Sequence, residues 1–264
     1  MIFIGSEPMA DQSGVQSLER TFNLIDILAD TGEELPLNSI AQKAGLNKST
    51  THRILSALVS RGYAKNNQGR YSLTLKMFEI GSQVLDRMDI MVSARPHLEH
   101  LRDQVHETIH LVTLDGIYIV YIQKLECNLS AYQMASRIGM RRPAYCTAAG
   151  KSILSAAGDS EIAEIWETSE IIAYTENTIT ELSMLHKELD ETRKTGLSYD
   201  NEENELGMRC VASPIWDYAD TSKYAISVSV PIIRMDDNRA AEIGKLVKAA
   251  AEAISLELGH RPRA

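Results

Sequence analysis

Three short helical periodicities followed by a hairpin signal fill residues 17–73, and their order leaves few folds open. A first amphipathic helix begins at Ser17, which is a favourable N-cap residue. Leu37–Ala44 and Lys48–Ser60 carry the next two apolar stripes, and Gly45 supplies a tight turn between them. Two β-prone runs around a Gly-containing polar tip at 66–69 then predict a hairpin. Helix, helix, turn, helix and hairpin in succession predict a winged helix-turn-helix.

The charge of this region is opposite in sign to that of the whole chain. The net charge is −9 over 264 residues, yet no Asp or Glu occurs between Leu35 and Phe78. The same window holds seven basic residues: Lys43, Lys48, Arg53, Arg61, Lys65, Arg70 and Lys76. A solvated helix face would mix both signs, whereas a patch of one sign is typical of a surface that binds phosphates. We therefore expect double-stranded DNA as a partner.

The third predicted helix presents small polar and basic side chains opposite its apolar stripe, which suits the major groove of a duplex. We expect groove or phosphate contacts from five of its residues: Lys48, Ser49, Thr50, His52 and Arg53. Arg70, beside the hairpin tip, is placed to reach the adjacent backbone or the minor groove. A two-fold dimer of this fold would read an inverted repeat whose half-sites lie about one helical turn, or a multiple of it, apart.

From residue 109 onward the sequence alternates between strand and helix patterns. Strands are expected at 110–114, 117–124, 129–135, 210–217 and 224–230, and helices at 150–157, 160–168, 181–195 and 237–258. Ahead of them, apolar positions from Met77 to Met88 predict a long amphipathic helix, and Pro96 is expected in the first turn of another helix. The second half thus predicts one antiparallel sheet flanked by helices, the shape of a small-molecule sensor domain.

The motifs that these regions carry resemble one known family. They are Leu46 to Leu55 (LNKSTTHRIL), Arg61-Gly62-Tyr63, Tyr71-Ser72-Leu73, Glu107 to Leu111 (ETIHL), Arg137-Ile138-Gly139, Thr147 to Lys151 (TAAGK), Asp200 to Gly207 (DNEENELG) and Ala225 to Pro231 (AISVSVP). In this order, over about Val15 to Gly259, they resemble the IclR-type bacterial transcription regulators. The stretch from Asn201 to Gly207 looks most like members that control uptake and breakdown of sugars and sugar acids.

The resemblance implies an α+β protein with an N-terminal winged helix-turn-helix, a linker helix and a GAF-like α/β effector-binding domain with a central antiparallel sheet. Its boundaries would be a disordered leader over 1–14, the DNA-binding domain over 15–75, the linker over 76–92 and the effector-binding domain over 93–264. The resemblance also implies a homodimer or homotetramer and a small carboxylic acid (a sugar or keto acid) as effector, while the sequence leaves open whether the protein is a repressor or an activator. No cofactor is implied.

The family's pocket positions correspond to six residues here: Ala148, Ala149, Asp200, Cys210, Ser227 and Ser229. The chemistry of these residues agrees with that role. Backbone N–H groups at a helix start suit a carboxylate. Two serines at i and i+2 of a strand point to the same face, where they can bond to ligand oxygens. The neighbouring pair Arg141 and Arg142 is expected on the surface, rather than forming a second anion site.

Two alternatives to a ligand-controlled regulator are a zinc-dependent hydrolase and a DNA-binding module without a sensor. His106-Glu107-Thr108-Ile109-His110 matches the HExxH motif of zinc hydrolases, which requires both histidines on one helix. The β-prone residues after Thr108 place His110 in a strand instead, so we expect no metal site and no catalytic residue. A DNA-binding module whose second half only oligomerises is the other alternative.

Composition excludes further classes. Three widely spaced cysteines without a CxxC pair suit free thiols in a reducing compartment. No apolar stretch approaches the ~18 residues that a membrane span requires. We therefore expect a cytoplasmic protein with no membrane association.

Overall fold

The computed structural model describes residues 16–85, 90–126 and 134–261. It divides into two compact units, with the boundary between Arg87 and Met88. The predicted leader over 1–14 lies outside the described residues. None of the helices within the described ranges is long and apolar enough to cross a bilayer.

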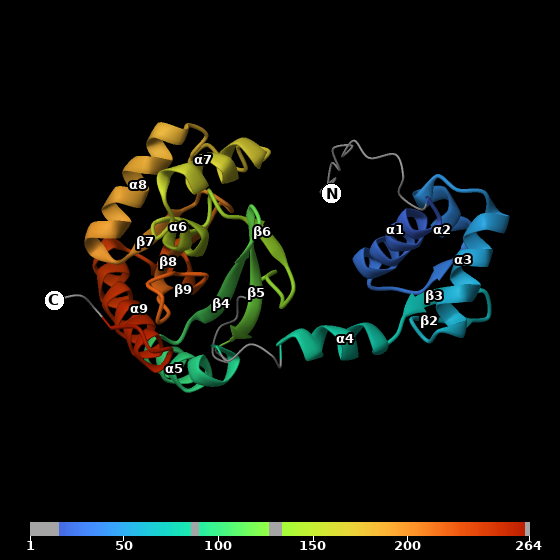
Figure 1. Cartoon of the computed structure of the whole chain (residues 1–264), viewed down its shortest axis with the longest axis horizontal. Helices are drawn as coiled ribbons and strands as arrows, with labels where there is room; N and C mark the ends of the chain where they lie inside the picture. The colour runs from blue at the N-terminus through green and yellow to red at the C-terminus, as the bar shows by residue number, and fades with distance from the viewer. Residues whose placement is uncertain (1–15, 86–89, 127–133, 262–264) are drawn as a thin grey trace. The chain divides into compact units, whose positions relative to one another are not determined.

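The N-terminal unit has the element order of a winged helix-turn-helix (Figure 1). Its elements are α1 (Gln16–Thr31), β1 (Leu35–Pro36), α2 (Leu37–Ala44), α3 (Lys48–Ser60), β2 (Ala64–Asn67), β3 (Arg70–Leu73) and α4 (Lys76–Leu85). The three strands form an antiparallel sheet in the order β1-β3-β2. Strand β1 was not predicted, since two residues are too few to show a period.

Local chemistry explains where the helices of this unit begin and end. Gly45 takes a left-handed conformation (φ 63°) after α2, and its N–H donates to the carbonyl groups of Ala41 and Gln42. Asn47 caps α3 by accepting a 2.8 Å hydrogen bond from the Thr50 N–H. The core between the helices and the sheet is apolar, with fully buried Leu24, Ile40 and Leu55 and the nearly buried Tyr71.

The C-terminal unit is built on a six-stranded antiparallel sheet in the order β6-β5-β4-β9-β8-β7. Its strands are β4 (Thr108–Asp115), β5 (Tyr118–Leu125), β6 (Arg141–Pro143), β7 (Ser198–Asn201), β8 (Met208–Ile215) and β9 (Tyr224–Pro231). Its helices are α5 (Ile90–Val105), α6 (Ala148–Leu154), α7 (Asp159–Thr168), α8 (Leu182–Thr195), the short 3-10 turn η1 (Ile232–Arg234) and α9 (Asp237–Glu257).

The two faces of this sheet are covered by different helices. Helices α5 and α9 pack against each other and against the sheet, and Val211 of β8 lies near Gly244 of α9. Helix α6 packs on β8 and β9, with α8 behind it (Figure 1). Because side chains alternate along a strand, Cys210 and Ala212 lie on the opposite face from Val211, on the side of α6.

Three sequence-based expectations differ from the structure. Pro96 lies inside α5 rather than in its first turn, because α5 begins at Ile90. The linker helix expected over 76–92 is helical as α4 over 76–85, while residues 86–89 lie outside the described residues and 90–92 belong to α5. The strand expected over 129–135 is not found at Met134 and Ala135, and its other positions are not described.

Candidate functional site

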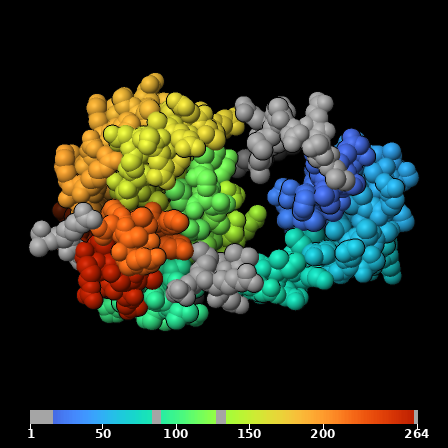
Figure 2. Space-filling view, in the orientation of Figure 1, coloured from blue at the N-terminus to red at the C-terminus, as the bar shows by residue number. Residues whose placement is uncertain are grey.

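The predicted DNA-contacting residues of α3 lie on its solvent face. Lys48, Ser49, His52 and Arg53 are exposed, and Thr50 is half-buried. Figure 2 shows α3 and the following hairpin forming part of the surface of the N-terminal unit. On the inner side Thr51 is fully buried, and its hydroxyl donates to the Asn47 carbonyl at 3.0 Å. Helix α3 therefore offers polar and basic side chains outward while its apolar stripe stays in the core.

The hairpin contacts an acidic residue, Glu34, that lies just outside the window from Leu35 to Phe78. Arg70 is exposed, and its guanidinium donates to the Glu34 carbonyl oxygen at 2.7 Å. The Glu34 carboxylate lies 3.4 Å from the Lys65 ammonium and accepts from the Asn67 amide at 3.2 Å. Glu34 precedes the window by one position, so it compensates part of the hairpin's positive charge.

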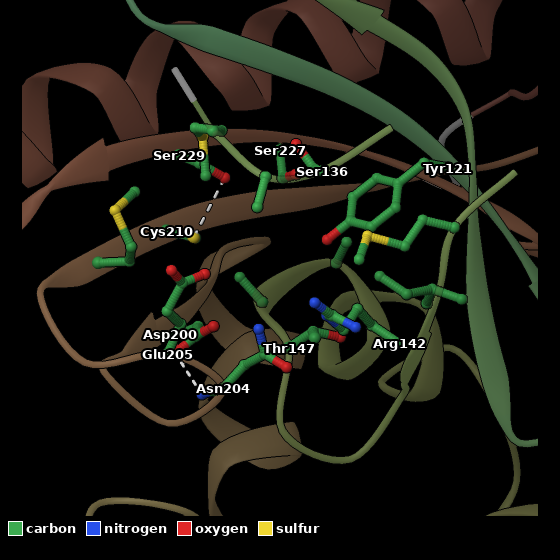
Figure 3. A pocket seen from close by; sticks show the side chains of 17 residues that line it. Tyr121, Ser136, Arg142, Thr147, Asp200, Asn204, Glu205, Cys210, Ser227 and Ser229 are labelled. Atoms are coloured by element: carbon green, nitrogen blue, oxygen red, sulfur yellow. Dashed lines mark hydrogen bonds between the residues drawn. The ribbon is translucent and has the colours of Figure 1, made fainter. Parts of the chain in front are cut away.

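The six residues predicted to bind an effector line one pocket of the C-terminal unit (Figure 3). They share it with residues that the sequence analysis did not assign to the effector pocket: Ile119, Tyr121, Met134, Ala135, Ser136, Met140, Arg142, Thr147, Asn204, Glu205 and Met208. Strands β5 to β9, the start of α6 and loop residues at 134–136 and 204–205 contribute these walls. The topology thus brings the six positions together, although they span residues 148–229.

Asp200 is the most perturbed acid of this pocket. Its side chain is 4% exposed, and one carboxylate oxygen accepts from the Glu203 N–H at 2.7 Å. Burial and the nearby Glu203 charge raise the pKa of Asp200 to about 7, despite the backbone hydrogen bonds that favour the charged form. Near neutral pH Asp200 is therefore a mixture of donor and acceptor forms.

A chain of hydrogen bonds runs behind the serine wall. The Cys210 thiol donates to the Ser229 hydroxyl at 3.2 Å, and burial raises the pKa of that thiol. His110 lies between Ser229, 3.5 Å from its Nδ1, and Ser136, 2.9 Å from its Nε2. Burial and the Lys124 charge lower the pKa of His110 to about 3, so its imidazole is neutral. A neutral imidazole has one donor and one acceptor nitrogen, which suits two hydroxyl neighbours.

The two arginines of β6 have separate environments. Arg141 is exposed, forms an ion pair with Asp115 at 2.5 Å and lies over the Tyr118 ring. Arg142 is half-buried and lines the pocket, because strand alternation turns it to the other face, where it is in register with Ile119. The expectation that both belong to the surface was wrong for Arg142, since the face of a strand depends on pairing that the sequence does not show.

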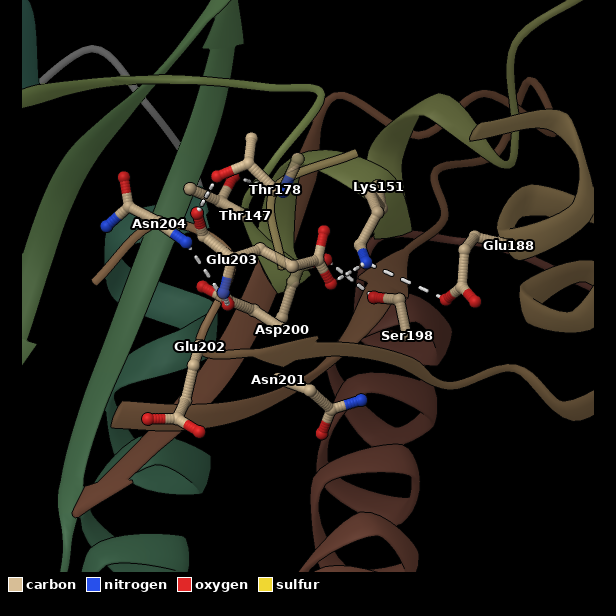
Figure 4. A network of polar contacts seen from close by, with 12 residues as sticks. Thr147, Lys151, Thr178, Glu188, Ser198, Asp200, Asn201, Glu202, Glu203 and Asn204 are labelled. Atoms are coloured by element: carbon tan, nitrogen blue, oxygen red, sulfur yellow. Dashed lines mark hydrogen bonds and ion pairs between the residues drawn. The ribbon is translucent and has the colours of Figure 1, made fainter. Parts of the chain in front are cut away.

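A buried ion pair fixes the loop after β7 (Figure 4). Lys151 of α6 is fully buried, and its ammonium lies 2.5 Å from the Glu203 carboxylate and 3.7 Å from that of Glu188. Thr178 donates from its hydroxyl to the Glu203 carbonyl at 2.6 Å. The loop that carries Asp200 is therefore attached to α6 and to the segment around Thr178.

Gly150 allows α6 to approach the strand end closely. A Cβ atom built at Gly150 would lie 2.2 Å from the Ala144 carbonyl oxygen, which is far inside van der Waals contact. Thr147 caps the helix by accepting from the Gly150 N–H at 3.2 Å. The Thr147 to Lys151 motif therefore encodes a cap, a close approach and a buried cation within five residues.

The HExxH sequence does not form a metal site. His106 follows α5 with φ 57° and is exposed, whereas His110 lies buried in β4. Glu107 pairs instead with Arg234, with a carboxylate–guanidinium distance of 2.7 Å. Within the described residues no group of three or more His, Cys, Asp or Glu is arranged to hold a metal ion. The zinc hydrolase alternative is not supported, because His106 follows the end of α5 whereas His110 lies within β4, so the two histidines do not share a helix.

Comparison with known protein families gives a match for each of the two units. Residues 17–68 match the model of the IclR helix-turn-helix domain, and residues 82–256 match that of the bacterial transcriptional regulator IclR C-terminal domain. The chain is 37% identical to the DNA-binding transcriptional repressor YiaJ of Escherichia coli over 95% of this chain and 90% of that protein. It is 36% identical to the regulator KdgR of the same organism, over 93% of this chain and 94% of that protein.

A solved structure shows that the similarity includes the fold. The IclR protein of Thermotoga maritima superposes with a TM-score of 0.80 at 34% identity, covering 93% of this chain and 99% of that one. These matches define a DNA-binding transcription regulator rather than an enzyme. The chain belongs to the IclR family.

Proposed function

We propose that this regulator is a repressor whose binding to operator DNA is controlled by a small carboxylic acid, a sugar or keto acid, in the C-terminal pocket. The supporting observation is that the six residues predicted from separate motifs line one pocket containing hydroxyl, carboxyl and guanidinium groups. The similarity to YiaJ, which is named a transcriptional repressor, supports the sign of regulation.

The DNA contacts are assigned to the exposed face of α3 and to the hairpin. Contacts to the groove or its phosphates would come from Lys48, Ser49, Thr50, His52 and Arg53. On the hairpin, Arg70 would contact the DNA as well, and it would either keep its hydrogen bond to the Glu34 carbonyl oxygen or exchange that bond for one to the DNA. A homodimer or homotetramer would place two such faces on an inverted repeat.

Ligand control requires that the acid bind one arrangement of the protein more tightly than another. The change in DNA affinity can be no larger than that difference in acid affinity. A C-terminal unit that only oligomerises would need no buried polar pocket, and the partly apolar, partly charged lining of this one favours the sensor function.

A thermal-shift screen of small carboxylic acids tests the proposal. Gluconate, galacturonate, pyruvate and glyoxylate would each be added to the full-length protein, and the acid that raises the melting temperature most would then be titrated against the protein bound to DNA flanking its own gene. We expect stabilisation and release of the DNA. Stabilisation by none of the acids, or release by none, contradicts the proposal.

A further inference from the structure

Arg142 is the one cationic side chain among the described residues that line the pocket. Its neighbour Arg141 has an aspartate partner at 2.5 Å, but Arg142 forms no ion pair within the described part of the chain. A half-buried guanidinium without a carboxylate partner retains unused donors, and its natural complement is a planar anion that accepts two hydrogen bonds.

The acidic groups of the pocket lie away from Arg142. Asp200 and Glu205 lie at the end of β7 and in the loop that follows it, and Figure 3 shows Arg142 and Tyr121 across the pocket from Asp200 and Cys210. Asp200 accepts two backbone N–H groups and sits beside Glu203, which is held by Lys151. That end of the pocket carries Glu205 and a partly ionised Asp200 and has no cation among the described residues of its lining, so it disfavours a carboxylate.

Hydroxyl groups would be accepted at the acidic end. Asp200 and Asn204 offer oxygen acceptors, and Ser227 and Ser229 lie on the same face of β9. Met134, Met140 and Met208 add apolar surface to the lining. One end of the pocket therefore suits an anion and the other suits neutral hydroxyl groups.

Building on the proposed function, we infer that Arg142 is the specificity-determining residue of this pocket. It binds the carboxylate of a hydroxylated monocarboxylic acid, and the hydroxyl end of that acid lies against Asp200, Ser227 and Ser229. This assignment differs from the expectation that the start of α6 binds the carboxylate, because α6 has only seven residues and its cap already occupies one of its N–H groups. Short keto acids without hydroxyl groups would leave the acidic end unfilled.

The test compares acids with neutral counterparts in four proteins, namely the unmodified chain and the variants Arg142→Met, Arg142→Lys and Arg141→Met. Gluconate and galacturonate are titrated by calorimetry beside sorbitol and galactose, which have comparable hydroxyl groups and no carboxylate. Arg142→Met removes the charge but retains most of the side chain's length. Arg141→Met is the matched control, because it lies next in the same strand and faces away from the pocket.

We expect at least one acid, and neither neutral compound, to bind the unmodified protein. Arg142→Met should weaken that acid about 10- to 100-fold, as expected for loss of a charge-assisted hydrogen bond. Arg142→Lys should restore part of the affinity, and Arg141→Met should change it less than about threefold, since that arginine lies outside the pocket. Melting temperatures of the unliganded variants check that each one folds.

Four outcomes would overturn the inference in distinguishable ways. Acid binding by Arg142→Met equal to that of the unmodified protein would remove Arg142 while leaving the proposed function intact. Equal binding of sorbitol and gluconate would show that the carboxylate is not recognised. If neither acid binds the unmodified protein but pyruvate or glyoxylate does, a sensor exists but its ligand is not hydroxylated. Binding of no acid at all contradicts the proposed function and this inference with it.

Discussion

Single side chains of this protein owe their chemistry to burial more than to their immediate sequence neighbours. Asp200 and His110 are both buried, and burial shifts their pKa values in opposite directions, to about 7 and about 3. Both shifts favour the neutral form, as expected when a charged group is removed from water. The pocket-lining Asp200 and the neighbouring His110 are therefore less charged near neutral pH than their residue types indicate.

The raised pKa of Asp200 predicts a pH-dependent stability difference. In the unfolded chain Asp200 ionises near pH 3.8, whereas in the folded protein it does so near pH 7. The folded state then holds a proton that the unfolded state has lost, so this group's stabilising contribution declines from about pH 4 to pH 7. Asp200→Asn keeps an acceptor oxygen and removes the charge.

We expect Asp200→Asn to raise the melting temperature relative to the unmodified protein more at pH 8 than at pH 5. Thermal unfolding without ligand at both values measures this difference. Asp217→Asn is the control, because Asp217 has a pKa lowered mainly by hydrogen bonds from Thr221 and Ala219 and is largely solvated. An equal shift at both pH values for Asp200→Asn would contradict the assignment.

Arg53 on α3 gives the second prediction at this scale. If Arg53 forms two hydrogen bonds to a guanine, Arg53→Ala should weaken specific DNA binding by about 1–3 kcal/mol. Binding to operator and to unrelated DNA is measured at the same salt concentration. Lys187→Ala, an exposed residue of α8 in the other unit, controls for the lost positive charge. Unchanged operator affinity would exclude Arg53 from the contact set.

At the scale of elements, α6 is held at an unusually short distance from the strand end before it. Gly150→Ala would place a methyl group 2.2 Å from the Ala144 carbonyl oxygen, so helix or strand must shift. We expect a loss of about 1–3 kcal/mol in the free energy of unfolding, the usual cost of overpacking. Urea denaturation measures it.

Gly158→Ala is the matched control for that substitution. Gly158 precedes α7 with φ −77°, and a Cβ atom built there meets nothing within 4 Å. Its replacement should change stability by less than about 1 kcal/mol, since it meets no steric clash and loses only the preference of the N-cap position for Gly over Ala. If Gly150→Ala lowers the free energy of unfolding no more than Gly158→Ala does, the Ala144 backbone shifts without cost to accommodate the added methyl group.

Elements with strong local signals could be predicted from the sequence. Leu37–Ala44 and Lys48–Ser60 were predicted with their observed bounds, because Gly45 and the apolar stripes mark them. Strand β7 was missed, since Ser198–Asn201 is short and rich in turn-forming residues, and only pairing with β8 makes it a strand. Pro96 was misplaced because Ala94, Leu98 and Leu101 bury the helix around it, which compensates for one lost hydrogen bond.

In the candidate site, too, residues with local sequence signals could be predicted, whereas residues whose positions depend on tertiary structure could not. Six pocket residues could be named from motifs, but Arg142, Tyr121 and Ser136 could not, because their places depend on the β5–β6 pairing and on a loop. The sequence alone suggests His110 only as a possible zinc ligand, whereas its position in β4 makes it a neighbour of two serines. Side-chain direction in a sheet is a tertiary property, and a single sequence does not contain it.

At the scale of the whole molecule, the two compact units carry different chemistry: one presents a basic helix, and the other encloses a polar pocket. A regulator of this kind should lose ligand response without losing DNA binding when only the pocket is altered. Replacing both Ser227 and Ser229 with Ala removes two hydroxyl groups from the pocket wall and leaves α3 unchanged.

For that double variant we expect normal operator affinity and no release of DNA by the acid that acts on the unmodified protein. Gel-shift titration with and without the acid measures both quantities. Ser169→Ala, a residue whose hydroxyl donates to the Ile165 carbonyl at the end of α7, serves as the control. A double variant that unfolds at room temperature would show instead that the two serines are structural.

The ion pair between Lys151 and Glu203 limits how this protein can adapt to different molecules. Moving the loop of Asp200 would separate two buried charges, and breaking such a pair costs about 3–5 kcal/mol. That cost would be subtracted from the binding free energy of any compound that moved the loop, so binding that leaves the acidic side in place is favoured. We therefore expect molecules of the wrong shape to be rejected at this side of the pocket, and conformational adjustment to a bound molecule to begin on the opposite side.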